Sequence, residues 1–131
     1  MNQTVRSVLV VDDDESIRAI VNLSIRTYGK CAVTLAASGR EALELLQRRH
    51  FDLIVLDVMI PEMDGPATLR EIRRQHPNFR TPVAFLTAKA QTSDSASLLE
   101  LGASEVISKP FDPRALVDTL CRIVKADHAE S

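Results

Sequence analysis

The chain has 131 residues, of which 45% are hydrophobic and 26% are charged, as is usual for one globular domain. The 16 basic and 18 acidic residues are interspersed and give a net charge of −2, which argues against direct nucleic-acid binding. The N-terminus lacks a signal-like apolar stretch, and no window is long enough to span a membrane. We therefore expect one cytoplasmic domain covering residues 1–131, with a core at about 7–125 and a polar tail at 126–131.

Five short apolar runs predict the buried strands of a parallel sheet. They lie at residues 8–11, 33–37, 53–56, 83–86 and 106–107. The second and fifth runs are the weakest strand signals. Two cysteines, Cys31 and Cys121, form no metal-binding pattern or disulfide framework, and we expect half-buried apolar thiols.

A helical pattern follows each run, and end signals mark the expected helices. In chain order these signals are Gly29 ending the first helix, Ser38 and Glu41 as a capping box for the second, Asp64-Gly65-Pro66 opening the third, Gly102 ending the fourth, and Asp112-Pro113 opening the fifth. Regular alternation of strands and helices predicts an α/β fold with helices on both faces of the sheet.

Polar residues follow four of the apolar runs. Asp12 and Asp13 follow the first run, Asp57 the third, Thr87 the fourth and Lys109 the last, one residue after Ser108. Taken singly, each has a simpler explanation as a turn residue or a helix cap. Because parallel strands end at one edge of the sheet, we expect these side chains to converge where α/β proteins bind ligands.

Such a convergence favours phosphoryl chemistry. Crowded carboxylates repel one another unless a cation lies between them, and oxygen ligands suit Mg²⁺. A lysine and a threonine hydroxyl suit phosphoryl oxygens. One carboxylate can then act as a nucleophile and form an aspartyl phosphate.

Four segments resemble the signatures of response-regulator receiver domains of two-component systems, especially the stand-alone, CheY-like kind. They are VVDD at 10–13, DVMIPEMDG at 57–65, LTA at 86–88 and KPF at 109–111. The resemblance covers about residues 7–125. It implies a flavodoxin-like (βα)5 fold whose five-stranded parallel sheet has the order 2-1-3-4-5.

The resemblance also implies roles for individual residues. Asp57 would be the phosphoacceptor. Mg²⁺ would be held by Asp57, by Asp13 directly, by Asp12 through water, and by the backbone carbonyl of Met59. Asp14, one position beyond the usual pair, is expected to be a cap or an outer group.

By the same resemblance, Thr87 would hydrogen-bond the phosphoryl group and Lys109 would pair with one of its oxygens. The peptide bond before Pro110 would be cis. The chain would be a signalling phosphoacceptor that catalyses only its own phosphorylation and dephosphorylation. Its donor would be a phosphohistidine on a histidine kinase or a histidine phosphotransfer protein.

A downstream output protein would read the face formed by the fourth helix, the fifth strand and the fifth helix. The first helix, around Ile17, Arg18 and Val21, is a candidate donor-docking segment. The helical period, however, directs Ile17 and Val21 towards the sheet. The three histidines show no motif for a phosphohistidine, and we expect them on the surface: His50, His76 and His128.

Three positions depart from the family pattern or tune it. Val106 replaces the usual aromatic residue, which puts coupling between the threonine and that ring in doubt. Met59 and Lys89 would flank the phosphoryl group. Because a methionine cannot orient a water by hydrogen bonding, we expect slow self-dephosphorylation.

The sequence argues against three other functions and leaves two variants of the receiver function open. A haloacid-dehalogenase phosphatase would need a second acid at residue 59, and a flavin or nucleotide carrier would need a glycine-rich loop that is missing. A calcium loop starting at Asp12 fails because Ile17 and Leu23 hold its required glycine and acid positions. The chain could also be a receiver cut from a larger regulator with a DNA-binding or enzymatic output, or a phosphorylation-independent docking receiver.

Overall fold

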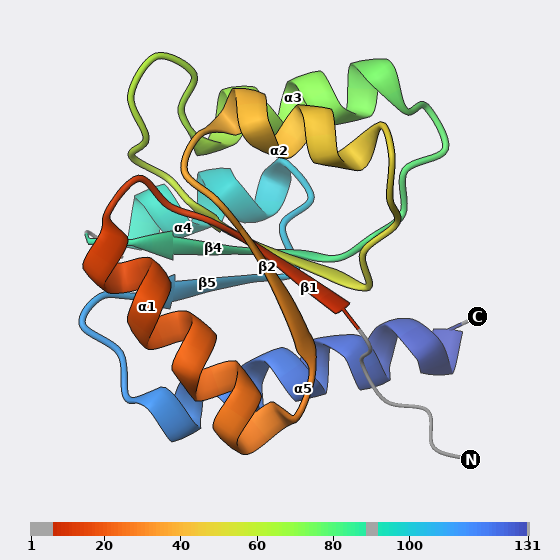
Figure 1. Ribbon diagram of the computed structural model, residues 1–131. Helices are drawn as coiled ribbons and strands as arrows, with labels where there is room; N and C mark the ends of the chain where they lie inside the picture. The colour runs from red at the N-terminus through yellow and green to blue at the C-terminus, as the bar shows by residue number, and fades with distance from the viewer. Residues whose placement is uncertain (1–6, 89–91, 131) are drawn as a thin grey trace.

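Strands and helices alternate along the whole described part of the chain (Figure 1). The computed structural model describes residues 7–88 and 92–130. The elements are β1 (Ser7–Val11), α1 (Glu15–Ser24), a π-helical turn (Ile25–Gly29), β2 (Ala32–Ala36), α2 (Gly39–Leu46), β3 (Leu53–Asp57), α3 (Gly65–Gln75), β4 (Val83–Thr87), α4 (Thr92–Glu100), β5 (Glu105–Ser108) and α5 (Pro113–Glu130). Among the described helices, none is both long and apolar enough to cross a membrane.

The five strands form one parallel sheet in the order β2-β1-β3-β4-β5. This is the flavodoxin-like order that the family resemblance implies, and each predicted apolar run lies in or overlaps its strand. In the sheet register, Asp57 lies opposite Leu86, and Thr87 lies opposite Ser108. The carboxyl ends of the central strands therefore meet at one edge, as predicted.

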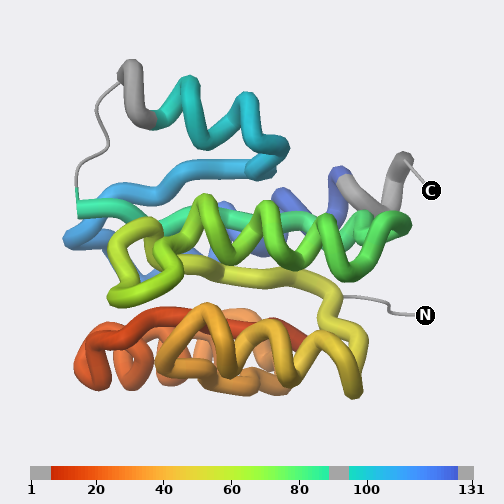
Figure 2. The backbone as a smooth tube through the Cα atoms, turned by 90° about the horizontal axis from the view of Figure 1, so that it is seen from above, coloured from red at the N-terminus to blue at the C-terminus, as the bar shows by residue number. Residues whose placement is uncertain are grey.

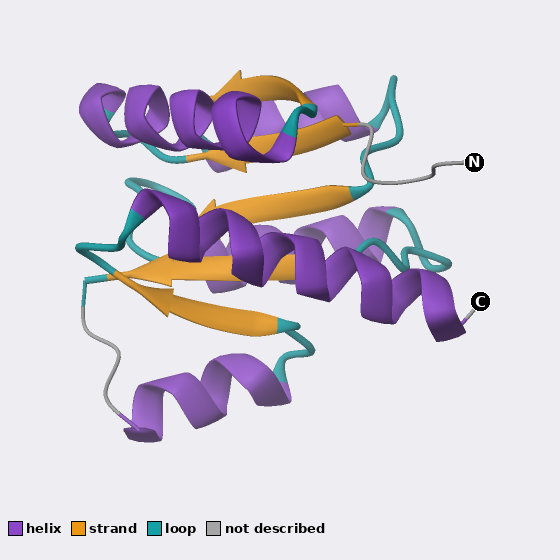
Figure 3. Cartoon of the chain, turned by 90° about the horizontal axis from the view of Figure 1, so that it is seen from below, coloured by secondary structure: helices purple, strands orange, loops and turns teal. Residues whose placement is uncertain are grey.

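Helices cover both faces of the sheet (Figures 1 and 3). On one side, Ile54 and Leu56 of β3 pack in a core with residues of α2, α3 and α4. On the other side, Leu53 and Val55 pack in a core with residues of α1 and α5. Alternate residues of a strand point to opposite faces, so a fully buried β3 supplies both cores. Helix α4 lies beside β5 at the sheet edge (Figures 2 and 3).

The predicted start signals of the helices are confirmed. Asp14 caps α1 by accepting hydrogen bonds from the backbone N–H groups of Ser16 and Ile17. Ser38 caps α2, and Asp64 caps α3. These caps satisfy N–H groups that have no partner within the helix.

The remaining helix signals are confirmed with one variation. The capping box of α2 has its Glu41 carboxylate accepting from the N–H of Ala37, one residue before the cap. Gly102 adopts a left-handed conformation with φ 102° after α4, and α5 begins at Pro113.

Two helix ends add detail to the prediction. The first helical segment ends at Gly29, as predicted, but its last turn is a π-helix and the left-handed residue that follows is Lys30, with φ 55°. Helix α5 continues to Glu130, through residues that we expected to form a polar tail. The half-buried cysteines are confirmed: Cys31 and Cys121 both pack at the edge of the core under α1 and α5.

Candidate functional site

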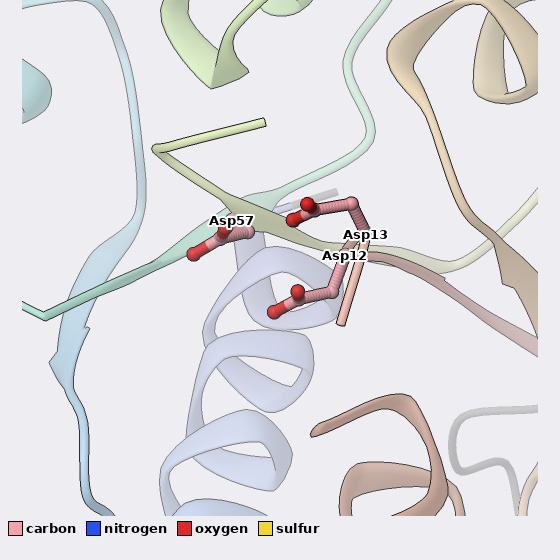
Figure 4. Close-up of side chains that lie close together, drawn as sticks. All are labelled: Asp12, Asp13 and Asp57. Atoms are coloured by element: carbon pink, nitrogen blue, oxygen red, sulfur yellow. The ribbon is translucent and has the colours of Figure 1, made fainter. Parts of the chain in front are cut away.

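Three carboxylates gather at the carboxyl edge of the sheet (Figure 4). Asp12 and Asp13 follow β1, and Asp57 is the last residue of the neighbouring strand β3. One oxygen atom from each side chain lies within 4.8 Å of the others. Asp12 and Asp57 are buried, with 0% and 4% of their surface exposed, whereas Asp13 is exposed. The site is thus a buried acidic pair with one open flank.

Lys109 connects the two buried acids. Its Nζ lies 2.9 Å from Asp57 Oδ1 and 3.1 Å from Asp12 Oδ2. The backbone N–H of Lys109 donates to the carbonyl of Thr87, 2.8 Å away, and the Lys109–Pro110 peptide bond is cis, as the resemblance implies. Residues that are far apart in sequence therefore meet in one cluster.

The Asp12 carboxylate is held in one orientation from two sides. Its Oδ1 accepts a hydrogen bond of 2.9 Å from the N–H of Asp14, while Oδ2 accepts from Lys109. Its backbone carbonyl accepts from the guanidinium of Arg18 at 2.8 Å. Arg18, which sequence reasoning considered only for docking, therefore supports the loop that carries the acids.

The electrostatics of the cluster favour additional positive charge. Burial raises the pKa of the Asp57 carboxyl above its ordinary value, and the charge of Asp12 adds to this effect, although the hydrogen bond from Lys109 opposes it. Burial disfavours the charged form of Lys109, but its hydrogen bonds to Asp57 and Asp12 outweigh burial and raise its pKa. A single ammonium group thus compensates three neighbouring carboxylates only in part.

The donor set fits Mg²⁺. All three side chains offer carboxylate oxygens, the ligands that hard divalent cations prefer. The exposed flank at Asp13 leaves room for water and phosphate oxygens, which Mg²⁺ usually keeps in its coordination shell.

The other predicted site residues differ in their burial and placement. Thr87 ends β4 and is buried, with 6% of its surface exposed. Met59 lies two residues after Asp57, with 73% of its surface exposed. Val106 is half-buried and packs against the core under α2, α3 and α4. Lys89 lies outside the described residues.

The start of helix α3 packs closely against the backbone at the end of β3. A Cβ atom on Gly65 would lie 2.4 Å from the carbonyl oxygen of Asp57 and 3.0 Å from the ring of Phe85. Gly65 also donates its N–H to the carbonyl of Val58 at 2.9 Å. The absence of a side chain at Gly65 thus permits the short connection from β3 to α3.

The profile described as "Response regulator receiver domain" matches residues 8–121. The chain belongs to the response-regulator receiver domain family. The suspected resemblance is thereby confirmed.

Curated relatives of this receiver domain are regulators rather than classical enzymes. The "Probable transcriptional regulator ycf27" of Porphyridium aerugineum is 40% identical over 109 residues, which cover 83% of this chain and 44% of the relative. The "Alkaline phosphatase synthesis transcriptional regulatory protein PhoP" of Bacillus subtilis (strain 168) is 41% identical with the same two coverages. The chain therefore spans about half the length of the curated relatives it matches.

Solved structures agree with the fold. The chemotaxis response regulator CheY4 of Vibrio cholerae superposes with a TM-score of 0.84 at 36% identity, covering 92% of this chain and 99% of that one. A CheY-like receiver domain protein from Methanospirillum hungatei JF-1 gives a TM-score of 0.85 at 26% identity, covering 98% and 100%.

The histidines agree only in part with the prediction that they lie on the surface. His50 is exposed, as predicted, but His76 is not a simple surface histidine, because its Nε2 atom is buried. The side chain of His128 lies outside the described residues. In α1, Val21 is buried and Ile17 half-buried against the core, as the helical period predicted.

Proposed function

We propose that this receiver domain accepts a phosphoryl group on Asp57, in a Mg²⁺-dependent reaction, from a phosphohistidine donor. The observation that carries the proposal is the ion-paired cluster in which Lys109 bridges Asp57 and Asp12 beside Asp13. A nucleophilic carboxylate, a cation and a group of metal-binding oxygens are the parts that phosphoryl transfer needs.

In the proposed reaction, a carboxylate oxygen of Asp57 attacks phosphorus as the P–N bond of the donor breaks. The imidazole leaves, and a P–O bond forms to Asp57. Lys109 then pairs with a phosphoryl oxygen, and the Thr87 hydroxyl donates a hydrogen bond to another. When bound, Mg²⁺ neutralises charge on the phosphoryl oxygens. Asp13 would bind it directly, with the carbonyl of Met59.

Asp12 suits an indirect role towards the metal. Both of its carboxylate oxygens already accept hydrogen bonds, from Asp14 and Lys109, and the side chain is fully buried. We therefore assign Asp12 to orienting Lys109 and to holding a metal-bound water. Asp13, on the exposed flank, is the acid that an arriving metal reaches first.

The switch would change a partner-binding surface. A phosphoryl group adds negative charge and three acceptor oxygens next to Thr87 and Lys109, at the ends of β4 and β5. Movement of these ends would alter the face formed by α4, β5 and α5. The donor in this scheme is a histidine kinase or histidine phosphotransfer protein, and the reader is a downstream protein or a further domain of the whole protein.

The experiment is phosphorylation with acetyl phosphate and Mg²⁺, followed by intact-protein mass spectrometry. Wild type should gain the mass of one phosphoryl group, and the gain should disappear with EDTA and in Asp57→Asn. Asp52→Asn, which changes a carboxylate outside the cluster, should still be phosphorylated. Labelling of Asp57→Asn to the wild-type extent would refute the assignment.

The valine at position 106 favours a second candidate function, that of a docking receiver that does not respond to phosphorylation. A valine has no ring that could swing inwards with Thr87. Beryllofluoride with Mg²⁺, an analogue of the phosphoryl group, should shift the backbone amide signals of α4, β5 and α5 if the domain switches. Shifts confined to residues near Asp57 would favour the docking function.

A further inference from the structure

A second concave site lies at the opposite edge of the sheet from Asp57. It is a cavity of about 830 Å³ lined by the segment that follows α2 and the segment that follows α3. These segments, residues 46–52 and 75–82, lead into the amino ends of β3 and β4. Each of these strands has five residues, so the cavity is about 16 Å from the phosphorylation site. We call this cavity the amino-edge groove.

The amino-edge groove is lined by an excess of basic side chains. Arg48, Arg49 and Arg80 line it, together with a single carboxylate, Asp52. Asp52 is already engaged elsewhere, because its Oδ2 accepts a hydrogen bond of 3.0 Å from the N–H of Ser7. Within the described part of the chain, neither Arg48 nor Arg80 has an ion-pair partner. Two guanidinium groups therefore remain available for an anion.

The floor of the groove is preorganised. The Arg49 guanidinium stacks over the buried Phe51 ring, 4.8 Å from its centroid. The side chains of Gln47 and Gln75 hydrogen-bond across the two segments at 3.4 Å. The first contact orders one segment and the second ties the two segments together, so the groove keeps its shape without a ligand.

An unsatisfied polar atom provides independent support. The buried Nε2 atom of His76, which also lines the groove, has no hydrogen-bond partner among residues 7–88 and 92–130. Buried polar atoms without a partner are rare because they lose the hydrogen bonds that water would supply. Rotation of the His76 ring would bring an N–H group to the groove, where a ligand oxygen would accept its hydrogen bond.

Favourable interaction with the C-terminal ends of helices explains only some of the basic residues that line the groove. Basic residues are favoured just after a helix, which explains Arg48 and Arg49 behind α2. Arg80, however, lies five residues beyond the last residue of α3 and outside the range of its dipole. Interaction with a helix dipole also leaves the buried Nε2 atom of His76 without a hydrogen-bond partner.

We propose that the amino-edge groove binds a small, multiply charged phosphate compound, such as an oligophosphate or a nucleoside triphosphate. Guanidinium groups form bidentate hydrogen bonds with phosphate oxygens, which makes phosphate a better match than a monovalent anion. The volume lies within the range of small-molecule sites and is bounded by two short segments, which favours a small ligand over a nucleic acid.

The test is calorimetric titration of the whole domain with inorganic tripolyphosphate and, in a separate arm, with ATP. EDTA is present throughout, so that the Asp57 site does not bind phosphate through Mg²⁺. The test pair is Arg48→Gln with Arg80→Gln. The control pair is Arg40→Gln with Arg70→Gln, two exposed arginines outside the groove that remove the same charge.

Loss of two charge-assisted hydrogen bonds should weaken binding at least about tenfold in the test pair. The control pair should stay within about twofold of wild type, since exposed charges at a distance are screened by salt. Backbone amide signals of residues 46–52 and 75–82 should shift on titration. Tighter ATP than tripolyphosphate binding would identify a nucleotide site, and the reverse would identify an oligophosphate site.

Several results would overturn the proposal. These are equal weakening in both pairs, shifts located only at other parts of the chain, no measurable heat with either ligand, or a short duplex DNA that binds more tightly than both. The test and control pairs replace exposed side chains, so both proteins should unfold at temperatures close to that of wild type.

Discussion

Asp57 experiences opposing influences at the scale of a single residue. Burial and the charge of Asp12 raise the pKa of its carboxyl, and Lys109 offsets this only in part. The folded protein therefore binds a proton at Asp57 more readily than the unfolded chain does. The resulting contribution to stability is fully present below the unfolded pKa and is lost as pH rises through the folded pKa.

Asp57→Asn removes the titrating carboxyl and therefore the loss of stability that accompanies its deprotonation. In metal-free buffer, the variant should have a higher free energy of unfolding than wild type at neutral pH, and the difference should shrink towards about pH 4, near the unfolded pKa. Urea unfolding in EDTA at several pH values measures both proteins. Asp118→Asn, an exposed acid on α5, is the matched control. A difference that grows as pH falls would contradict the argument.

Met59 gives a kinetic prediction at the same scale. Its side chain is exposed beside the proposed phosphoryl position and offers no hydrogen bond to orient a water. Met59→Asn should speed loss of phosphate from Asp57 by about tenfold, because an amide can position the attacking water. Decay of the phosphorylated form, followed by mass spectrometry, checks this. The phosphorylated Met59→Leu variant is the control and should lose phosphate at the wild-type rate. An unchanged or slower rate of phosphate loss in Met59→Asn would count against the role of Met59.

At the scale of elements, most boundaries could be predicted from local signals. The caps at Asp14, Ser38 and Asp64 and the apolar runs depend on neighbouring residues alone, so the sequence contains them. The end of the first helical segment does not follow the same rule. Its last turn is a π-helix, which contains more residues per turn, so the left-handed position moves from Gly29 to Lys30.

This shift leads to a stability prediction. A left-handed conformation is unfavourable for a lysine and open to a glycine, so Lys30→Gly should raise the free energy of unfolding by about 0.5–1 kcal/mol. Thr27→Gly, inside the π-helical turn, should lower it by about the same amount. Urea denaturation at one pH measures both; destabilisation by Lys30→Gly would show that its side chain contributes more than its backbone costs.

At the scale of the whole molecule, the parallel arrangement made the site predictable. Once the strands were expected to be parallel, Asp12, Asp57, Thr87 and Lys109 had to converge at one edge. The strand order itself came from the family resemblance, because periodicity does not distinguish permutations of a parallel sheet. The amino-edge groove escaped prediction because packing of α2 beside α3 brings its two walls together.

Metal binding should also be visible in global stability. A ligand that binds only the folded state stabilises it, by about 2.7 kcal/mol at a concentration 100 times its Kd. Mg²⁺ should therefore raise the melting temperature of wild type in a saturable way. Asp13→Asn should largely lose this increase while keeping the metal-free melting temperature, since Asp13 is exposed. Asp112→Asn serves as the control; an undiminished increase in Asp13→Asn would remove that acid from the metal site.

The close contact between Gly65 and the carbonyl of Asp57 has a consequence for genetics. Any larger residue at position 65 must push the helix away from the strand end that carries the nucleophile. A random screen for alleles that cannot signal should therefore recover substitutions of this glycine as often as substitutions of the acids. This is expected although Gly65 has no side chain that could take part in the reaction.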